Sequence, residues 1–484
     1  MSAFARSPWS SRSSDTWIAA SLAIAVALTR LPFVSRELAT WDSVLLARAL
    51  DLGFSTGPDL ADQRPQAPGY LFYVGAAALL RPILGSPNAA FVTLSIAASA
   101  LTVAVIYVFC RRFGSRGGAL VAAGVYATGP LVWSFGEIAM PYAVLGLLSA
   151  LLAMLFWDGR HGAASARLGA SVAYGLATGF RQDLVLLLAP LWLWMIWPRP
   201  REWIAAGAAA GIGALAWLVP SAMAAGGVAA YLNNVAVQSD RAAAFSVSAR
   251  GVDGATDNLA MIVYGLGWAL AAVTPVLLVA ALARLVARRP SPGARALFFA
   301  LWIIPPLLFY AGVHIGVSGY ILSVVPAFAV LAALLFDAAR RSASSLGRRI
   351  ATGIAAVAIV ANGLIFVATP APFSAAAIAD HDRSLQERIT YIRSHYPPFT
   401  TVILAQFEFV FLAQYLPEYH ALFFGPGPEA LSADPPEVNV RPGGGAVLLF
   451  GKVPALADGD TSAVLPGLAA LTRGSVRAYE IRMR

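Results

Sequence analysis

The chain is a series of apolar runs, each about 17–25 residues long, separated by short turns that carry arginine. A run of that length is what an α-helix needs to cross the hydrocarbon core of a membrane. Because backbone amides find no water there, a helix that satisfies its own hydrogen bonds is the natural form for such runs. Only 12% of the residues are charged and 58% are apolar, which excludes an ordinary soluble protein.

The arginine-rich turns predict how these runs are oriented, because arginine and lysine favour the cytoplasmic side of a membrane. Arg6 and Arg12 place the N-terminus in the cytoplasm. Five later turns carry arginines and are cytoplasmic for the same reason, at 111–116, 160–167, 199–201, 284–295 and 340–349. They account for much of the net charge of +9, so we expect no nucleic-acid partner.

This orientation predicts an all-α polytopic membrane bundle of about eleven helices. The predicted spans are 17–33, 88–110, 119–135, 141–157, a buried hairpin over 168–197 broken near Arg181, 203–224, 258–283, 297–313, 320–336 and 350–369. A first external loop covers 35–87, with 70–84 as an interfacial or re-entrant segment, and a second covers 226–257. The first run has no small-x-small cleavage site after it, so we expect a retained helix rather than a signal peptide.

The chain divides, by prediction, into a transmembrane domain over 1–370 and a soluble extracytoplasmic domain over 371–484. In the second part, 378–395 has an amphipathic helix pattern, and four segments have strand character, at 400–405, 420–424, 446–450 and 476–483. A loop rich in glycine and proline covers 425–445. A small α/β domain is expected. Cys110 is the single cysteine, which excludes an intrachain disulfide and a thiol-ligated metal cluster.

Two acids lie on the predicted external side. Asp42 follows Thr40 at the start of a predicted short helix whose apolar face could rest on the membrane surface. It is either a general base held at the bilayer surface or a first-turn acid that complements the helix dipole, with Thr40 as the cap. Glu137 precedes the fourth helix and is either a second functional acid or another helix-start acid.

Cationic groups lie on the same side. Arg181 and Asp183 occupy the tip of the buried hairpin, either as a local ion pair that closes the turn or as a functional site, since an arginine at membrane depth costs roughly 2.5–3.5 kcal/mol. His314 is either an interfacial packing residue or a site residue. Acids and cations at one external mouth suit a reaction on a lipid-borne phosphate ester. A cation would stabilise the departing phosphate, and a carboxylate would deprotonate the incoming hydroxyl.

With these motifs the chain resembles the bacterial multi-spanning glycosyltransferases of the GT-C fold, which include protein O-mannosyltransferases and the aminoarabinose transferase of lipid A. The resemblance covers roughly residues 31–333 and follows the order and the side of short motifs. These are Trp41-Asp42-Ser43, Gln66-Ala67-Pro68-Gly69-Tyr70, the turn at Glu137, the hairpin tip from Gly179 to Asp183, and Gly319-Tyr320 leading into Pro326.

The resemblance implies transfer of a sugar, with inversion, from a polyprenyl-phosphate donor to a cell-envelope acceptor at the periplasmic face of the inner membrane. It implies that Asp42 is the catalytic base and that Glu137 is a second acid orienting the acceptor or a metal. Arg181 and His314 would face the donor phosphate. The implied substrate-binding residues are Gln66, Tyr70, Asp183 and Tyr320. The expected partners are the donor, membrane lipid and the acceptor; no metal site is assigned, and a divalent metal is left open as a cofactor.

Two departures from the family pattern keep other functions open. Asp42 is followed by Ser43 where the family often has a second acid, and Gln66-Ala67-Pro68 stands where relatives often have His-Pro-Pro. One alternative is a lipid-linked sugar transporter or flippase, which predicts polar residues along a path at mid-membrane. The chain shows no internal repeat of the kind that marks many transporters. The other alternative is a non-catalytic envelope scaffold that kept the fold.

Overall fold

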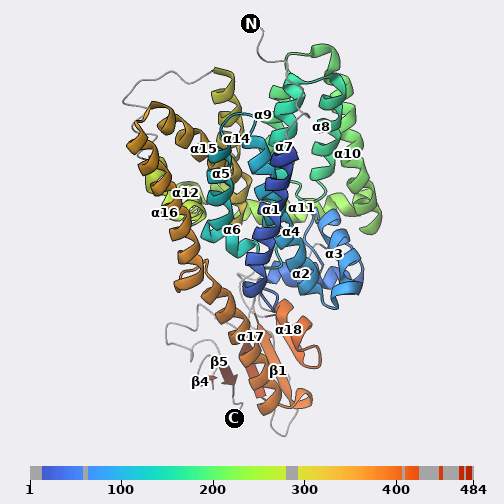
Figure 1. The fold of residues 1–484 in the computed structure, drawn as a ribbon. Coiled ribbons are helices and arrows are strands. Elements are labelled where there is room, and N and C mark those ends of the chain that lie inside the picture. The colour runs from blue at the N-terminus through green and yellow to red at the C-terminus, as the bar shows by residue number, and fades with distance from the viewer. Residues whose placement is uncertain are drawn as a thin grey trace. The chain divides into compact units, whose positions relative to one another are not determined.

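The computed structural model describes residues 13–57, 64–278, 293–405, 409–423, 446–450, 468–473 and 476–481. The chain forms two compact units, coloured along the sequence in Figure 1. The first unit comprises Met1–Val34, Tyr70–Met223 and Phe245–Ile378, and the second comprises Ser35–Gly69, Ala224–Ala244 and Ala379–Arg484. The second unit therefore joins part of the predicted first external loop to the C-terminal region, while the division of the chain at residue 370 stays a prediction.

The first unit is a helical bundle. Its main elements are α1 (Ser13–Arg30), α3 (Leu71–Leu84), α4 (Pro87–Cys110), α5 (Arg116–Thr128), α6 (Pro130–Phe135), α7 (Tyr142–His161), α8 (Ala164–Ala177), α9 (Leu184–Ile196), α10 (Trp203–Ala224), α12 (Val247–Leu270), α14 (Gly293–Gly312), the 3₁₀ turn η5 (Ser318–Ser323), α15 (Val325–Ser342) and α16 (Ser345–Ala368). Helix α4 packs against α1, α5 and α7, so it lies at the centre of the bundle (Figure 1).

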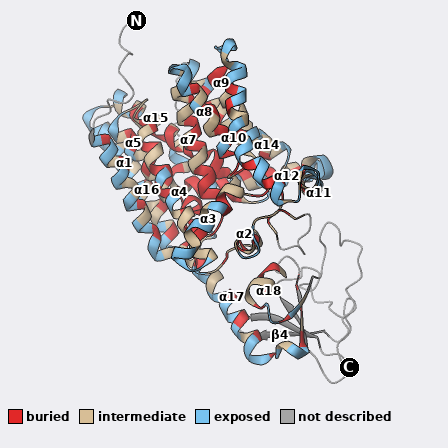
Figure 2. Ribbon diagram, turned by 90° about the vertical axis from the view of Figure 1, so that its right-hand side faces the viewer, coloured by how far each residue is buried: buried red, intermediate tan, exposed pale blue. Residues whose placement is uncertain are grey.

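Seven helical segments of the described chain are long and apolar enough to cross a membrane: Ser14–Phe33, Pro87–Cys110, Tyr142–His161, Pro200–Ala224, Val247–Leu278, Gly293–Gly312 and Ser345–Ala368. In Figure 2 the residues of α4 and α7 are largely buried, whereas α16 exposes much of its surface. The exposed side chains of α16 include Ile350, Ile354, Val357 and Val360. A helix that presents β-branched apolar side chains outward is suited to lipid rather than to water. The protein is thus a multi-pass membrane protein.

The other predicted spans correspond to the shorter helices α5, α8, α9 and α15, so the count of eleven stays a prediction. The predicted helix over 119–135 is wrong in one respect, because it is interrupted between α5 and α6. Pro130 has no amide hydrogen and disfavours helical geometry at the residue before it, so Gly129 leaves the helix. A side chain at Gly129 would also collide with the backbone carbonyl of Ala269.

The second predicted external loop, 226–257, is also corrected. It is mostly helical, because α11 (Val228–Ala244) and the start of α12 occupy it. Gly251 interrupts α12 with a positive φ of 57°, a conformation that glycine adopts without steric cost. The helix expected at 203–224 is found at those residues as α10, and the segment 70–84 is found as the 14-residue helix α3.

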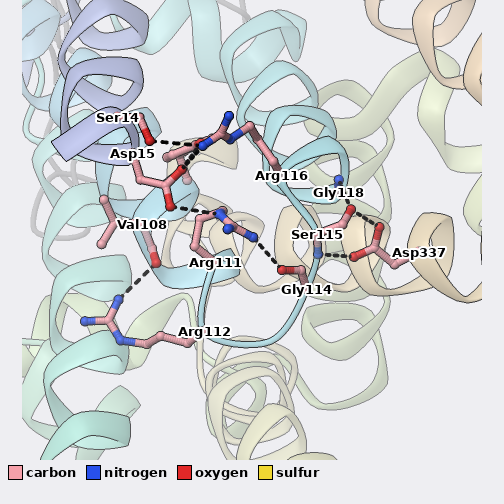
Figure 3. Close-up of polar contacts among 11 residues, drawn as sticks. Ser14, Asp15, Val108, Arg111, Arg112, Gly114, Ser115, Arg116, Gly118 and Asp337 are labelled. Carbon is pink, nitrogen blue, oxygen red and sulfur yellow. Dashed lines mark hydrogen bonds and ion pairs between the residues drawn. The ribbon is translucent and has the colours of Figure 1, made fainter. Parts of the chain in front are cut away.

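The first arginine-rich turn, residues 111–116, forms ion pairs and hydrogen bonds with the helices around it (Figure 3). Arg111 and Arg116 each form an ion pair with Asp15 of α1, at 3.2 Å. At the start of α5, Asp337 of α15 accepts a hydrogen bond of 2.7 Å from the amide of Ser115. Through their shared partner Asp15, these arginines therefore connect the ends of α1, α4 and α5.

The second unit contains α2 (Trp41–Leu52), α11, most of α17 (Ala375–His395), α18 (Phe409–Tyr415) and a five-stranded sheet in the order β2-β1-β3-β5-β4. The strands are β1 (Thr401–Ala405), β2 (His420–Phe423), β3 (Ala446–Phe450), β4 (Leu468–Arg473) and β5 (Val476–Ile481). Strand β1 pairs in parallel with β2 and β3, and β5 is antiparallel to β3 and β4. Helix α18 packs against α2.

The predicted fold class, an all-α membrane bundle with a small α/β domain, is confirmed. The helix expected at 378–395 is α17, and the four predicted strands correspond to β1, β2, β3 and β5. Strand β4 and helix α18 were not predicted, since both are short and lack a strong pattern of their own. The predicted glycine-rich loop at 425–445 lies outside the described residues.

Candidate functional site

Asp42 lies in the first turn of α2, in the second unit. Thr40 is the N-cap: its side chain accepts a hydrogen bond from the amide of Ser43 at 3.2 Å, and the Ser43 hydroxyl accepts one from the amide of Thr40 at 2.8 Å. This reciprocal capping box confirms the predicted role of Thr40. The first-turn position of Asp42 fits the helix-dipole alternative, and its role as a general base stays a prediction.

Helix α2 is held inside the protein by its apolar residues. Leu45 and Ala49, expected on a face that could rest on the membrane, are buried, as is Val44. Leu52, the third residue of that face, is exposed, so the face packs against protein over Leu45 and Ala49 only. Helix α11 binds the part of the predicted first external loop that follows α2. Its Tyr231 and Asn234 donate to the backbone carbonyls of Pro68 and Thr56 at 3.1 and 2.8 Å.

Gln66, a predicted substrate-binding residue, also contacts α11. Its side-chain oxygen accepts a hydrogen bond of 2.8 Å from the Gln238 amide. Tyr231, Asn234 and Gln238 recur at helical spacing on α11, so one face of that helix binds the end of the first loop. The Gln66 side chain is thereby fixed in direction.

Arg181 lies in the tip between α8 and α9, as predicted, and is only 3% exposed. The tip is packed tightly: the carbonyl of Gly179 accepts from the amide of Phe72 on α3 at 3.1 Å. A Cβ at Gly179 would approach the rings of Phe72 and Trp217 within 2.6 and 2.7 Å. Glycine is therefore required there for α3 and α10 to approach the hairpin.

The Arg181 guanidinium forms a two-pronged ion pair with Asp183. Its Nε donates to one carboxylate oxygen at 3.2 Å and its Nη2 to the other at 2.7 Å. The local ion pair, one of the two alternatives for the tip, is therefore present. It holds the guanidinium plane in one orientation, since parallel N–H groups match the two carboxylate oxygens.

Three tyrosine rings surround the same guanidinium. Its central carbon lies 4.8 Å from the ring centre of Tyr320, 5.1 Å from Tyr142 and 5.6 Å from Tyr70. These distances are within the range of cation–π attraction, which favours a cation over aromatic faces. The structure thus brings together four predicted site residues, Tyr70, Arg181, Asp183 and Tyr320. We call these four residues with Tyr142 the arginine–tyrosine cluster.

Tyr142 was not predicted as a site residue. It begins α7 directly after Pro141, in the predicted external turn that also carries Glu137, and this position was the available signal. Gly319 allows the contact with Tyr320, because a Cβ at Gly319 would lie 2.5 Å from the Tyr142 ring. The Gly319-Tyr320 pair noted in the sequence therefore has a packing reason.

Glu137 does not lie in the accessible position that was predicted for it at the external mouth of the bundle. It is fully buried, with one carboxylate oxygen 2.9 Å from the donating Trp133 indole and 4.0 Å from the Nε of Arg30. Arg30 is equally buried and lies 4.3 Å over the Trp133 ring. Burial raises the pKa of Glu137 to about 8, although Arg30 and the Trp133 hydrogen bond oppose the rise.

His314 lies in the turn between α14 and η5. Asn258 of α12 holds this turn, because its side-chain amide donates to the carbonyl of Ala311 at 3.3 Å and its oxygen accepts from the amide of Ile315 at 3.2 Å. Burial lowers the pKa of His314, and the charge of Arg250 lowers it further, against a hydrogen bond with the backbone of Phe245. The lowered pKa favours the neutral imidazole, and a role for His314 towards the donor phosphate stays a prediction.

Within the described residues, no group of three or more histidine, cysteine, aspartate or glutamate side chains is arranged to hold a metal ion.

No protein-family model matches this sequence, and no curated protein matches it. Among solved structures, the chain is similar to ArnT from Cupriavidus metallidurans bound to undecaprenyl phosphate, with a TM-score of 0.61 and 13% identity over 97% of this chain and 98% of that chain. It is also similar to the apo state of ArnT from the same organism, with a TM-score of 0.58 and 16% identity over the same shares.

The likeness extends over almost the whole of both chains, so it concerns the complete fold. The GT-C-like fold predicted from the order of the motifs is confirmed. At these identities the similarity shows the fold, and the chemistry has to be argued from the residues of this chain.

Proposed function

We propose that this protein transfers a sugar from a polyprenyl-phosphate donor to a cell-envelope acceptor at the extracytoplasmic face of the inner membrane. The observation that carries the proposal is the arginine–tyrosine cluster: a buried guanidinium at a hairpin tip, held by one carboxylate and surrounded by aromatic faces. The fold supports it, because ArnT, which has the same fold, was solved with undecaprenyl phosphate bound. In this proposal the C-terminal domain is also extracytoplasmic.

Arg181 is proposed to bind the donor phosphate. Two of its three nitrogens donate to Asp183, and the remaining nitrogen, Nη1, carries two further N–H groups in the same plane. As the sugar leaves, negative charge develops on the bridging phosphate oxygen. A fixed cation in a site that excludes water stabilises that charge far more than it would in bulk solvent. Asp183 is then a positioning residue that keeps the guanidinium in place.

Asp42 is proposed to act as the general base. The acceptor hydroxyl gives its proton to the carboxylate while its oxygen forms a bond to the anomeric carbon of the sugar. The bond between that carbon and the phosphate oxygen breaks, and polyprenyl phosphate leaves with both bonding electrons. The stereochemistry at the anomeric carbon is inverted. Tyr70 and Tyr320 are proposed to contact the substrate, and Gln66 is proposed to bind it in the orientation set by Gln238.

Glu137 is proposed to have a different role from the second acid suggested by its position in the sequence. Its side chain is directed to Arg30 and Trp133 in the interior, so we propose that it stabilises the turn between α6 and α7. The same turn is held by Ser95 of α4, whose hydroxyl lies 2.8 Å from the carbonyl of Ile138. That turn leads into Tyr142.

Replacing Arg181 with lysine tests the proposal. Lysine keeps the charge but has neither the planar fork nor the stacking surface of arginine, so we expect transfer from a polyprenyl-phosphate sugar to fall about 100-fold or more. The rate is measured with the purified protein and a radiolabelled donor. The matched control is Arg112→Lys, because Arg112 forms a similar two-pronged pair with Asp158 in the first arginine-rich turn. Equal losses in the two variants would contradict a role for Arg181 in phosphate binding.

The same preparation separates the remaining hypotheses. A flippase reconstituted in vesicles would move the lipid-linked sugar across the bilayer without forming a glycosylated product. A scaffold would neither move nor consume it. Formation of product that depends on Arg181 excludes both.

A further inference from the structure

We propose that Asp382 of α17 is a positioning residue for the reaction. It fixes the chain segment that leads into Asp42, so the C-terminal region contributes to the geometry of the site. The catalytic consequence rests on the function proposed above. The geometry itself lies within the second unit, which contains both the segment and most of α17.

The Asp382 carboxylate binds the backbone just before α2. One oxygen accepts a hydrogen bond of 2.6 Å from the amide of Arg36. The other accepts from the amide of Glu37 at 3.3 Å and lies 2.8 Å from the Ser35 hydroxyl, whose single proton is shared with the carbonyl of Glu37 at 2.7 Å. A charged acceptor that collects donors from three consecutive residues fixes the direction of that segment. These residues are separated from Asp382 by about 345 positions in the chain.

The next residue is held by α17 and α18 together. The amide of Leu38 donates to the Tyr415 hydroxyl at 2.9 Å, and the carbonyl of Leu38 lies 3.2 Å from Nε2 of His381. The Gln386 side chain donates to the Glu37 carboxylate at 2.6 Å. Three successive amides, at positions 36, 37 and 38, therefore donate to side chains of the C-terminal region.

This segment has no regular secondary structure of its own, since it lies between the 3₁₀ turn Leu31–Phe33 and α2. Its backbone donors would otherwise be satisfied by water and its dihedral angles would be free. Thr40, the N-cap of α2, comes two residues after Leu38, and Asp42 follows in the first turn. The start of α2, whose first turn carries Asp42, is therefore held by the capping box and, just before it, by the contacts of Asp382 and Tyr415.

The loop is held at its far end as well, where Tyr231 and Asn234 of α11 bind the carbonyls of Pro68 and Thr56. Both ends of the loop that carries Asp42 thus depend on segments distant in sequence. A misplacement of about 1 Å in a catalytic group can cost on the order of 100-fold in rate. Loosening either end is expected to lower the rate of transfer more than the affinity for the donor.

The test compares Asp382→Asn with the matched control Asp380→Asn in the full-length protein. Asp380 lies on the same helix, but its side chain is exposed. Within the described residues, its ion-pair partner is Arg383, which is also exposed. In Asp382→Asn an amide NH₂ replaces one acceptor and faces backbone N–H groups. We expect hydrogen exchange of the amides at 36–38 to become about tenfold faster, and no change in Asp380→Asn.

Steady-state kinetics supply the second measurement. We expect kcat of Asp382→Asn to fall about 10- to 100-fold, with KM for the lipid-linked donor within about twofold of the parent. Tyr415→Phe is the milder variant, and it should increase exchange at Leu38 without affecting Arg36. It remains informative if Asp382→Asn fails to fold.

The outcomes separate the two proposals. Unchanged exchange at 36–38 in both Asp382→Asn and Tyr415→Phe overturns the inference whatever the activity. Faster exchange with an unchanged kcat overturns the positioning role. If the parent protein transfers no sugar, the proposed function fails and the catalytic consequence falls with it, while the exchange data still show whether Asp382 holds the segment.

Discussion

Replacing Asp42 with asparagine is expected to lower sugar transfer about 100- to 10,000-fold, the range that a general base typically contributes. Asparagine has nearly the same size and shape but cannot accept the proton of the acceptor hydroxyl. The fold should be retained, because Thr40 and Ser43 cap α2 without help from Asp42. Loss of the favourable dipole interaction costs about 0.3–1 kcal/mol. The measurement is the initial rate of transfer by purified protein, with its melting temperature recorded beside it.

The control for this variant is Asp51→Asn, on the same helix but exposed near its last turn. It removes one negative charge from α2 and should leave transfer unchanged. A fully active Asp42→Asn protein would remove Asp42 from the mechanism. An inactive Asp51→Asn protein would show that the charge of the helix matters rather than the position of one carboxylate.

Replacing Glu137 with alanine is expected to destabilise the protein by about 3–5 kcal/mol at pH 9, above the raised pKa of Glu137, because it leaves the buried Arg30 without a counter-charge. It also removes the acceptor of the Trp133 indole N–H. The expected result is a large loss of thermal stability in detergent, followed by reduced accumulation in membranes. Glu418→Ala serves as the control, since its pair with Arg393 is exposed and should be worth less than about 1 kcal/mol.

A double variant shows whether the destabilisation comes from the charge. Arg30→Met combined with Glu137→Leu replaces the pair by apolar side chains of similar volume and should recover most of the lost stability. A Glu137→Ala protein as stable as the parent would contradict the structural role proposed for Glu137. In that case the acid would be free to serve as the second functional acid suggested by the sequence.

The fold followed largely from the sequence because lipid imposes a strict requirement. Each apolar run must satisfy its own backbone, so helices such as α4 and α10 were found within a residue or two of the predicted bounds. The break at Gly129-Pro130 and the helix α11 were missed for local reasons. The predicted span 119–135 includes Pro130, and the predicted loop 226–257 includes the residues of α11.

The arginine–tyrosine cluster was partly predictable, since Tyr70, Arg181 and Tyr320 all lie on turns at the predicted external side. The pairing of Glu137 with Arg30 was not predicted, because the two are more than 100 residues apart. One signal was available: Arg30 lies at the end of an apolar run, where a charge needs a partner. The contacts of Asp382 carry no local signal at all, since helix α17 shows only an amphipathic pattern.

The most direct test of the account is lipid analysis of a strain of the source organism that lacks this protein. We expect a polyprenyl-phosphate sugar to accumulate and an envelope product to lose that sugar. The parent protein should restore both when expressed from a plasmid, and the Asp42→Asn protein should restore neither. A deletion strain whose lipid-linked sugars and envelope glycans match those of the parent strain would contradict the account.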